Sequence, residues 1–465
     1  MVPDVQPIAD MDPNVTDLSD NRLPYRGRST LDGILSLFAD VRAGEGLTSL
    51  LLMLNVFLLL TAYYTIKPVR EALILGSAGA EIKAYTGAIQ ALMFMAIVPF
   101  YSAFANRVNR LHLINGVTAF FLSNLVVFYF LGNMNFPIAI PFFVWVGLFN
   151  LMLVAQVWAF ANDIYTQEQG RRLFAITGIG SSLGAIFGSY IAGRFFEQIG
   201  PYSMMLLCAT ILIVCMVLTT VIHRRETPRT PWPEAVEESH QPVGGKGGFA
   251  LIFQHRYLLL IAAMVLLTNV VNTTGEFILG KAVKLHAEAL VASGGTALTQ
   301  EAYIGKFYSN FFFWVNVLGA GFQLFVVSRI MKYIGIGRAL LILPFIALGS
   351  YSLLLFAPVL GMVQMVKVFE NSTDYSIQNT ARHALFLRTS REAKYKAKTA
   401  VDNFFWRAGD TVSALLVFVG TQLAFGVRSF AMVNVVLVIV WAAIVVAIIR
   451  VRKNKAETRI EERAA

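Results

Sequence analysis

Charged and amide side chains recur at helical spacing inside segments of this sequence that are otherwise apolar. The longest row lies in the segment 360–383, and its members follow at steps of four, three, four and four, which places them on one helix face. The row consists of Lys367, Asn371, Asp374, Gln378 and Arg382, with Glu370 beside it. Such groups can bind a polar solute, or they can pair with one another.

The charges of this row require a surrounding other than lipid. A charged side chain at the centre of a membrane helix costs about 2.5 to 3.5 kcal/mol, so the charged members must face another helix or water. Either they line a cavity, or they form buried ion pairs, and Lys367 and Glu370 are spaced to meet on one helix. We favour the cavity and keep the ion pairs as the alternative.

A second row lies near the end of the first apolar segment. Tyr63, Lys67 and Arg70 share one helix face, and Glu71 lies beside them. The planar guanidinium of Arg70 suits a phosphate or a carboxylate. The alternative is that the stems of Lys67 and Arg70 reach the headgroups at a helix end, where Pro68 kinks or ends the segment.

Three further segments carry polar residues at comparable places. One holds Asn269, Asn272 and Glu276 on a single face, with Lys281 one turn further, and another ends in Asn162. A third follows the basic run 388–398 and contains the charged residues Asp402, Arg407 and Asp410. For Arg407 and Asp410, solute binding and ion pairing between helices are equal alternatives.

The sequence lacks motifs for metal, redox or hydrolytic chemistry. Cys208 and Cys215 are its only cysteines, and no histidine pair has metal-ligand spacing. The segment 275–281, GEFILGK, has the spacing of a Walker A loop, but Ala282 stands where a magnesium-binding Ser or Thr is required. No nucleophile and base occur at a suitable spacing. We therefore expect no cofactor, no metal and no enzymatic activity.

The composition indicates which elements position these residues. The chain has 465 residues, of which 56% are hydrophobic and 14% charged, whereas soluble domains contain about 25% charged residues. A membrane crossing takes about 20 apolar residues, and the apolar segments accommodate about twelve. The expected spans are 47–68, 84–105, 112–132, 138–160, 173–196, 203–222, 257–279, 303–328, 338–357, 360–383, 399–424 and 429–450.

The net charge of the chain is +10, and the positively charged residues fall in alternate loops of this arrangement. By the positive-inside rule, these loops and both termini lie in the cytoplasm. The loop cations are Arg107, Arg110, Arg171, Arg172, Arg224, Arg225, Arg229, Arg329, Lys332, Arg338, Arg388, Arg391, Lys394, Lys396 and Lys398. The acidic N-terminal residues resemble neither a cleaved signal nor a transit peptide. A bacterial inner membrane is the expected location.

The segment 223–255 concentrates proline, glycine and charge between two apolar blocks of six spans each. The expected fold is an all-α membrane protein with a 6+6 bundle like that of major-facilitator transporters, in which spans 1, 4, 7 and 10 surround a central cavity. Its expected parts are a cytoplasmic segment 1–45, a bundle 46–222, a linker 223–255, a bundle 256–450 and a cytoplasmic tail 451–465. The polar rows then fall around one cavity.

Four motifs resemble the nucleotide transporter family typified by the plastid and intracellular-parasite ATP/ADP translocases. YYTIKPVREALIL with GSAGAEI is similar to the end of the family's span 1, VWAFAND to its span 4, and NTTGEFILGK to its span 7. The most specific is the stretch from STDYSIQNTARHAL to KAKTAVDNFFWRAGD. These motifs place family positions on Lys67, Arg70, Glu71, Asn162, Glu276, Lys281, Lys398, Asp402 and Arg407.

The resemblance implies exchange of nucleotides, or of related phosphorylated anions, by alternating access. Six cations would then neutralise the phosphates, and four carboxylates would limit the positive charge of the empty cavity. The cations are Lys67, Arg70, Lys281, Lys367, Arg382 and Arg407, and the carboxylates are Glu276, Glu370, Asp374 and Asp402. The family's acidic residue in span 4 is missing, since this region offers only Asn150 and Gln156.

Two other functions remain open on the sequence. One is proton-coupled transport of another organic anion, with Glu276 or Asp374 as the protonated group. The other is a transporter-like receptor or scaffold that moves no solute. For each of these three functions the expected partners are a small anionic solute and the lipid bilayer, and no nucleic acid is expected. A monomer is compatible with all three functions.

Overall fold

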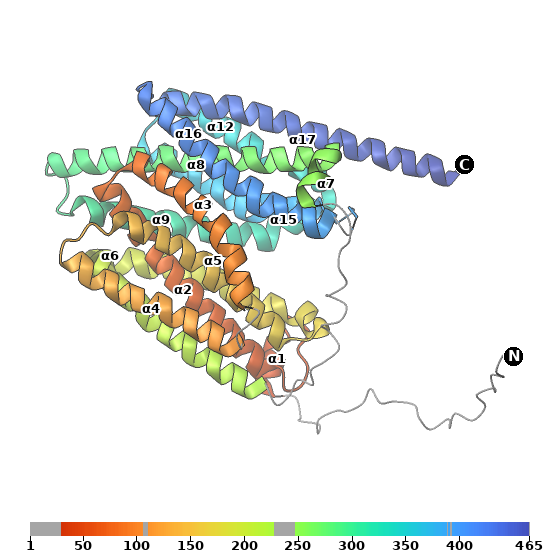
Figure 1. The fold of residues 1–465 in the computed structure, drawn as a ribbon, viewed down its shortest axis with the longest axis horizontal. Helices are drawn as coiled ribbons and strands as arrows, with labels where there is room; N and C mark the ends of the chain where they lie inside the picture. Colours follow the sequence, from red (N-terminus) through yellow and green to blue (C-terminus); the bar gives the residue numbers. More distant parts are fainter. Residues whose placement is uncertain (1–28, 106–109, 227–246, 388, 391–392, 465) are drawn as a thin grey trace.

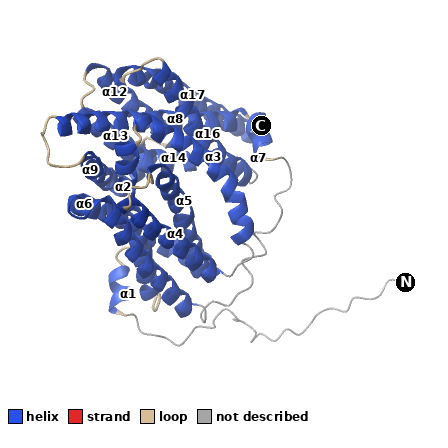
Figure 2. Cartoon of the chain, turned by 60° about the vertical axis from the view of Figure 1, so that its left-hand side comes forward, coloured by secondary structure: helices blue, strands red, loops and turns tan. Residues whose placement is uncertain are grey.

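The computed structural model describes residues 29–105, 110–226, 247–387, 389–390 and 393–464. Within these residues the chain forms helices joined by short loops, without a strand (Figures 1 and 2). Most of the expected linker and the acidic N-terminal residues lie outside the described residues. So do the loop cations Arg107, Arg229, Arg388 and Arg391.

The described part of the N-terminal half contains six helices, of which α1 is short. They are α1 (Thr30–Leu35), α2 (Gly46–Ser77), α3 (Ala80–Ala105), α4 (Arg110–Asn133), α5 (Ala139–Ile164) and α6 (Gln167–Glu226). Asp32 ties α1 to α2, because its carboxylate accepts hydrogen bonds from the backbone N–H groups of Gly44 (3.2 Å) and Gly46 (2.9 Å). This contact fixes the loop that leads into the first long helix.

The C-terminal half contains longer helical segments that π-helical turns interrupt. The α-helices are α7 (Gly248–Gln254), α8 (Arg256–Ala292), α9 (Gln300–Gly321), α10 (Val327–Tyr333), α11 (Ile336–Ala339), α12 (Ile342–Phe356), α13 (Leu360–Thr373), α14 (Asn379–Ala384), α15 (Lys398–Ala400), α16 (Trp406–Gln422) and α17 (Val427–Ala464). The π-helical turns are η3 (Phe322–Val326), η4 (Asp374–Gln378), η5 (Ala393–Ala397) and η6 (Val401–Phe405). Turns of this kind often accompany functional sites in helices.

Eight of the described helical stretches are long and apolar enough to cross a membrane. One of them, α6, bends at Gly200, whose φ of 74° favours glycine, so it supplies two of the expected spans. The eight stretches therefore account for nine of the twelve expected spans. The remaining three correspond to segments outside that set, namely α3, α13 to α14 and η5 to α16. The expectation of an all-α membrane bundle is therefore confirmed.

The first span is longer than the sequence predicted, because Pro68 does not end it. The helix α2 continues through Pro68 to Ser77. Lys67 and Glu71 are 8% and 1% exposed, so they lie inside the protein and not at a helix end among headgroups. The Arg70 side chain is 15% exposed, so the alternative in which the stems of Lys67 and Arg70 reach the headgroups is wrong for this conformation.

Glycines bring α6 against α2 in the N-terminal half. A Cβ at Gly180, Gly184 or Gly188 would lie 2.3 to 2.4 Å from a carbonyl oxygen of α2. Close approach of membrane helices at small residues provides van der Waals packing where lipid offers no hydrophobic driving force. The three glycines follow one another at steps of four residues, so they lie on one face of α6 and let the two helices approach closely.

The two halves meet along α6 and α9 and along α3 and α16 (Figure 1). Across the first contact, Asn316 of α9 donates a hydrogen bond to the Ser189 hydroxyl at 3.2 Å. Across the second, the Arg407 guanidinium lies over the Phe94 ring of α3, 4.5 Å from its centroid. Residues from both halves can therefore surround one site.

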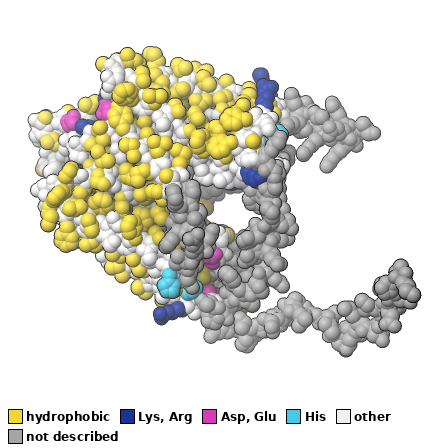
Figure 3. Space-filling model, viewed as in Figure 1, with side chains coloured by type: hydrophobic (Ala, Val, Ile, Leu, Met, Phe, Trp, Pro, Cys, Tyr) yellow, Lys and Arg dark blue, Asp and Glu magenta, His cyan; other side chains and the backbone are white. Residues whose placement is uncertain are grey.

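The outer surface is apolar over most of the face in Figure 3, and its few charged side chains lie near the margins of the view. Large exposed side chains occur on several long helices, among them Phe120 of α4 and Met432 of α17, which are 58% and 59% exposed. Exposed apolar surface of this extent marks an interaction surface, which for this bundle is lipid.

Candidate functional site

A cavity of about 200 Å³ lies between the two halves. Its charged lining residues are Arg70 of α2, Lys83 of α3, and Arg407 and Asp410 of α16. The other lining residues are Ala80, Ala84, Gly87, Gln90, Phe143, Thr273 and Phe277. The sequence predicted a cavity with walls from spans 1, 4, 7 and 10. The helices α2, α5 and α8, which are spans 1, 4 and 7, do line it, but α3 and α16 take the place expected for span 10.

The N-terminal half contributes a cluster of two cations around one carboxylate. The Lys83 ammonium lies 2.6 Å from Glu71, and the Arg70 Nε donates a hydrogen bond to Glu71 at 3.1 Å. The guanidinium of Arg70 also lies over the Phe143 ring, 4.7 Å from its centroid. Because Glu71 is buried and contacts both cations, it holds them toward the cavity while its single charge neutralises only one.

The C-terminal half contributes Arg407 and Asp410. Asp410 accepts hydrogen bonds from Asn269 (2.8 Å) and Thr273 (3.1 Å), and its other oxygen lies 3.6 Å from the Arg407 guanidinium. A Cβ at Gly409 would lie 2.8 Å from the Asn269 Cβ, so glycine lets α16 approach α8 here. The carboxylate is therefore well satisfied, and the guanidinium edge remains available to the cavity.

A buried network on α8, α12 and α13 lies behind this cavity. The Lys367 ammonium is within 3.2 Å of Glu370, 3.7 Å of Glu276 and 3.0 Å of the Asn272 side-chain oxygen. Tyr351 donates a hydrogen bond to Glu370 at 3.0 Å, and Asn371 donates one to Glu276 at 2.8 Å. In this conformation the ion-pair alternative describes Lys367 and Glu370, and Glu276 belongs to the same network.

Lys67 is a buried cation without an ion pair among the described residues. Its ammonium lies 3.9 Å from the centroid of the Phe312 ring and 5.3 Å from that of Tyr64. Cation–π contacts of this kind stabilise a charge that is removed from water. Lys67 thus adds a positive charge close to Arg70 and Lys83, and Glu276 and Glu71 are the carboxylates that interact with it over a longer distance.

Other predicted residues lie elsewhere. Asn162 is exposed at the end of α5. Lys281 pairs with Glu81 at 3.0 Å, near the helix ends remote from α1. Asp374 is 8% exposed, and its carboxylate makes neither a hydrogen bond nor an ion pair with any described residue.

A further predicted group gathers where α14 meets the helices that lead into α16. The Arg382 guanidinium lies over the Trp406 ring at 4.7 Å, and it donates a hydrogen bond to Asn379 at 3.1 Å. Asp402 and Lys398 lie near His383 in the same region. One carboxylate oxygen of Asp402 is buried without a hydrogen-bond partner among the described residues. This group does not line the cavity between the halves.

Sequence reasoning missed Lys83 and Gln90. The predicted second span began at residue 84, whereas α3 begins at Ala80 and includes Lys83 in its first turn. The signal was present in the preceding residues GAEI, because Glu81 is favoured in the first turn of a helix. Placing the helix start at Ala80 would have put Lys83 inside the membrane, where a charge indicates function.

Comparison with known proteins assigns this arrangement to a family. Residues 47–370 match the family model described as Major Facilitator Superfamily. The chain belongs to this superfamily. Residues 342–457 of this superfamily member match a second model, described as TLC ATP/ADP transporter, which supports the resemblance seen in the motifs.

Curated relatives of this superfamily member include two proteins named ADP,ATP carrier protein 1. The one from Chlamydia pneumoniae is 22% identical over 57% of this chain and 57% of its own length. The one from Chlamydia trachomatis serovar D is 22% identical over 57% of this chain and 55% of its own length. The chain therefore spans less than two thirds of the relatives it matches.

Solved structures share the fold of this superfamily member. A bacterial homolog of the human lysosomal transporter Spinster, in an inward-facing and unoccupied conformation, superposes with a TM-score of 0.56 at 14% identity, covering 87% of this chain and 96% of that one. The nucleoside transporter NupG gives a TM-score of 0.58 at 11% identity, covering 87% and 98%. At these identities the likeness concerns the fold.

Proposed function

We propose that the protein is a secondary transporter that exchanges nucleotides, or related phosphorylated anions, by alternating access. The observation that carries the proposal is the convergence of three cations from both halves on one cavity. Arg70 and Lys83 come from the N-terminal half, and Arg407 comes from the C-terminal half. The relatives named ADP,ATP carrier protein and the ATP/ADP transporter model matched by residues 342–457 support the choice of solute.

The charge balance of the cavity lining favours an anion. Among the described residues, Glu71 and Asp410 are the carboxylates in contact with the three cavity cations, so one positive charge is left without a carboxylate. Lys67 lies close to this charge, whereas the buried network around Lys367 contains two carboxylates and one cation. Phosphate groups carry the acceptor oxygens that guanidinium and ammonium groups bind most strongly.

Exchange follows from the free-energy cost of reorienting the carrier when its cavity holds no solute. A carrier without solute would reorient with uncompensated positive charge at its centre, whereas the bound anion removes that charge. The solute can then shift the equilibrium between the two states through its different affinity for each. We therefore propose obligatory exchange, in which one anion must enter before another leaves.

The proposal includes the placement of the chain. We propose that it lies in a bacterial inner membrane with both termini in the cytoplasm, and that the segment 223–255 joins the halves there. We further propose that the six-helix units act as the two moving bodies, and that the monomer is sufficient for exchange, because the cavity is lined by residues of one chain.

The test is uptake by proteoliposomes that contain the purified full chain. Radiolabelled ATP, ADP and phosphate are offered outside, with ADP, phosphate or buffer inside. Exchange predicts uptake only with an internal anion. Arg407→Gln should reduce this uptake about 10-fold to 150-fold, since a charged hydrogen bond contributes about 1.5 to 3 kcal/mol. Arg338→Gln, which removes an exposed cation of the short helix α11, is the control. Full uptake into vesicles that contain only buffer would overturn exchange.

Asp374 supports a second candidate, proton-coupled transport of another organic anion. Asp374 is 8% exposed and its carboxylate makes no hydrogen bond or ion pair with a described residue. Carboxylates inside membrane helices mark proton pathways in pumps and transporters. A pH gradient that drives uptake into vesicles without internal anion, and that no longer does so in Asp374→Asn, would favour this candidate. Uptake that ignores the gradient and needs an internal anion would favour exchange.

A further inference from the structure

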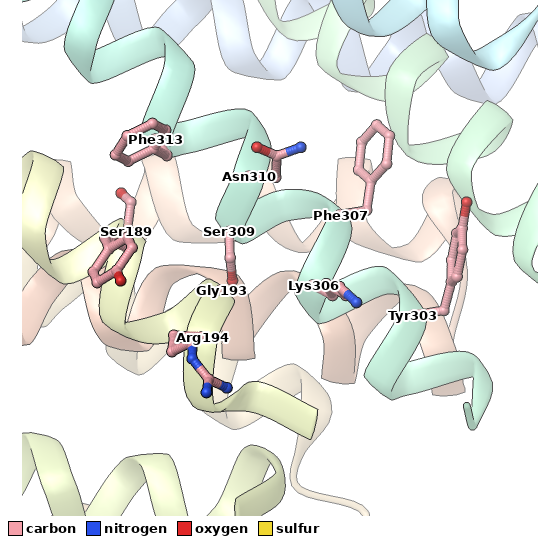
Figure 4. Close-up of a pocket in the computed structure, with 10 residues that line it drawn as sticks. Ser189, Gly193, Arg194, Tyr303, Lys306, Phe307, Ser309, Asn310 and Phe313 are labelled. Atoms are coloured by element: carbon pink, nitrogen blue, oxygen red, sulfur yellow. The ribbon is translucent and has the colours of Figure 1, made fainter. Parts of the chain in front are cut away.

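A second hollow lies between α6 and α9 (Figure 4), and it shares no lining residue with the cavity that contains Arg70, Lys83 and Arg407. This groove has a volume of about 540 Å³. Its main lining residues are Tyr190 and Arg194 of α6, and Tyr303, Lys306, Phe307 and Phe313 of α9. Tyr190 is 54% exposed and the neighbouring Trp314 is 47% exposed, so the groove opens on the surface that faces lipid.

The lining changes from polar to aromatic along the groove. On α9, Lys306 lies six residues from the helix start at Gln300 and Phe313 lies thirteen residues from it. At a rise of about 1.5 Å per residue, the two are about 9 Å and about 20 Å from the helix end. The charged end is therefore near the level of the headgroups, and the aromatic end reaches toward the middle of the bilayer.

The charged end carries an uncompensated cation. The Lys306 ammonium lies 2.5 Å from Glu197 of α6, which neutralises it. Arg194 makes no ion pair with any described residue, and its side chain is exposed beside the groove (Figure 4). An arginine at this level can offer a planar fork to a phosphate.

We propose that this groove binds an anionic phospholipid of the leaflet remote from α1, with the headgroup phosphate on Arg194 and an acyl chain along Tyr190 and Phe313. The charge of the free arginine complements the net negative headgroup, and the aromatic walls complement the chain. The rings of Tyr190 and Phe313, whose centroids are 6.5 Å apart, come from opposite halves. A lipid in the groove therefore contacts both halves and stabilises the conformation in which α6 and α9 touch.

The lipid proposal is independent of the transported solute and is tested without transport. The thermal unfolding midpoint of the purified full chain in neutral detergent is measured with added phosphatidylglycerol or phosphatidylcholine. Phosphatidylglycerol should raise the midpoint more than phosphatidylcholine does, and Arg194→Gln should remove at least half of that difference. Arg428→Gln is the matched control, because Arg428 is an exposed cation in the first turn of α17, at the same end of the helices.

Three results would overturn the lipid proposal. The first is an equal loss in Arg428→Gln, which would indicate general surface charge. The second is a shift with inorganic phosphate or ADP alone that also depends on Arg194, which would indicate a site for free anions. The third comes from Asn310→Trp, which fills the groove and leaves its charges in place. An unchanged lipid effect in this variant would show that no acyl chain occupies the groove.

Discussion

The Lys281 ammonium of α8 lies 3.0 Å from the Glu81 carboxylate of α3, so this ion pair joins the two halves of the molecule. It lies near the helix ends remote from α1. The two side chains are 24% and 30% exposed, which places the pair at the rim of the protein. Alternating access requires such a contact to break when the cavity opens toward that side.

We expect Lys281→Gln to shift the equilibrium toward the state that is open at this rim. A partly exposed ion pair contributes about 0.2 to 1 kcal/mol, which corresponds to about 1.4-fold to 5-fold in population. The measurement is the labelling rate of Gly87→Cys, a cavity position with open space around it, by an impermeant maleimide. The native cysteines are buried and add little background.

The charge-swapped variant, Lys281→Glu with Glu81→Lys, is the control for the rim pair. It restores an attraction between the same two positions, so its labelling rate should return toward that of the parent. A labelling rate that Lys281→Gln leaves unchanged, or that the swap fails to restore, would show that the pair does not hold the halves together.

The buried Lys367 gives a prediction about stability. Lys367→Met leaves Glu370 and Glu276 without their cation, and breaking a buried ion pair in this way costs about 3 to 5 kcal/mol. The double variant Lys367→Met, Glu370→Gln removes one of the stranded charges and should recover part of the loss. Unfolding midpoints in detergent at one scan rate compare the variants, and a double variant no more stable than the single one would contradict the network.

The fold was predictable because its signal is repeated along the whole chain. Each apolar segment independently indicates a membrane helix, and an error at one end does not affect the others. The errors occurred where a local rule was overridden by packing. Pro68 is accommodated within α2, because the helix around it is buried between others, and the span extends nine residues beyond the predicted end.

The candidate site was less predictable, because face and depth depend on packing. Arg70 and Arg407 line the cavity and were named from the sequence, whereas Lys83 was placed in a loop. The row from Lys367 to Arg382 was expected to share one helix face, but the π-helical turn η4 lies within it. This turn changes the direction of the residues that follow, so Lys367 and Arg382 reach different surroundings. No spacing rule reveals such a turn.

The contact of α6 with α2 gives a prediction that compares two glycines of one helix. A Cβ at Gly184 would lie 2.3 Å from the Phe57 carbonyl oxygen, whereas a Cβ at Gly178 meets nothing within 4 Å. Gly184→Ala should therefore destabilise the protein by about 1 to 3 kcal/mol through overpacking. Gly178→Ala should be neutral or slightly stabilising. Equal unfolding midpoints for the two variants would contradict the close approach.

The start of α2 carries a pH-sensitive contact outside the membrane-spanning segments. Glu45 accepts two hydrogen bonds from the Arg172 guanidinium, at 2.9 and 3.0 Å. Burial raises the pKa of the Glu45 carboxyl, but the hydrogen bonds from Arg172, Arg42 and Gln169 lower it further, so that its pKa lies below the usual 4.5. The carboxylate is therefore better stabilised in the folded protein than in the unfolded chain.

A lowered pKa fixes the sign of the pH dependence. The stabilisation by Glu45 is complete above pH 4.5, the carboxyl's ordinary pKa, and it is lost as the pH falls through the lower folded value. Arg172→Gln should therefore reduce the free energy of unfolding at pH 7 by about 1 to 3 kcal/mol and so lower the unfolding midpoint. At pH 3 the decrease in the midpoint should be much smaller. Arg171→Gln removes the neighbouring exposed cation and should change little at either pH. A deficit in Arg172→Gln that is as large at pH 3 as at pH 7 would show that Glu45 is not its partner.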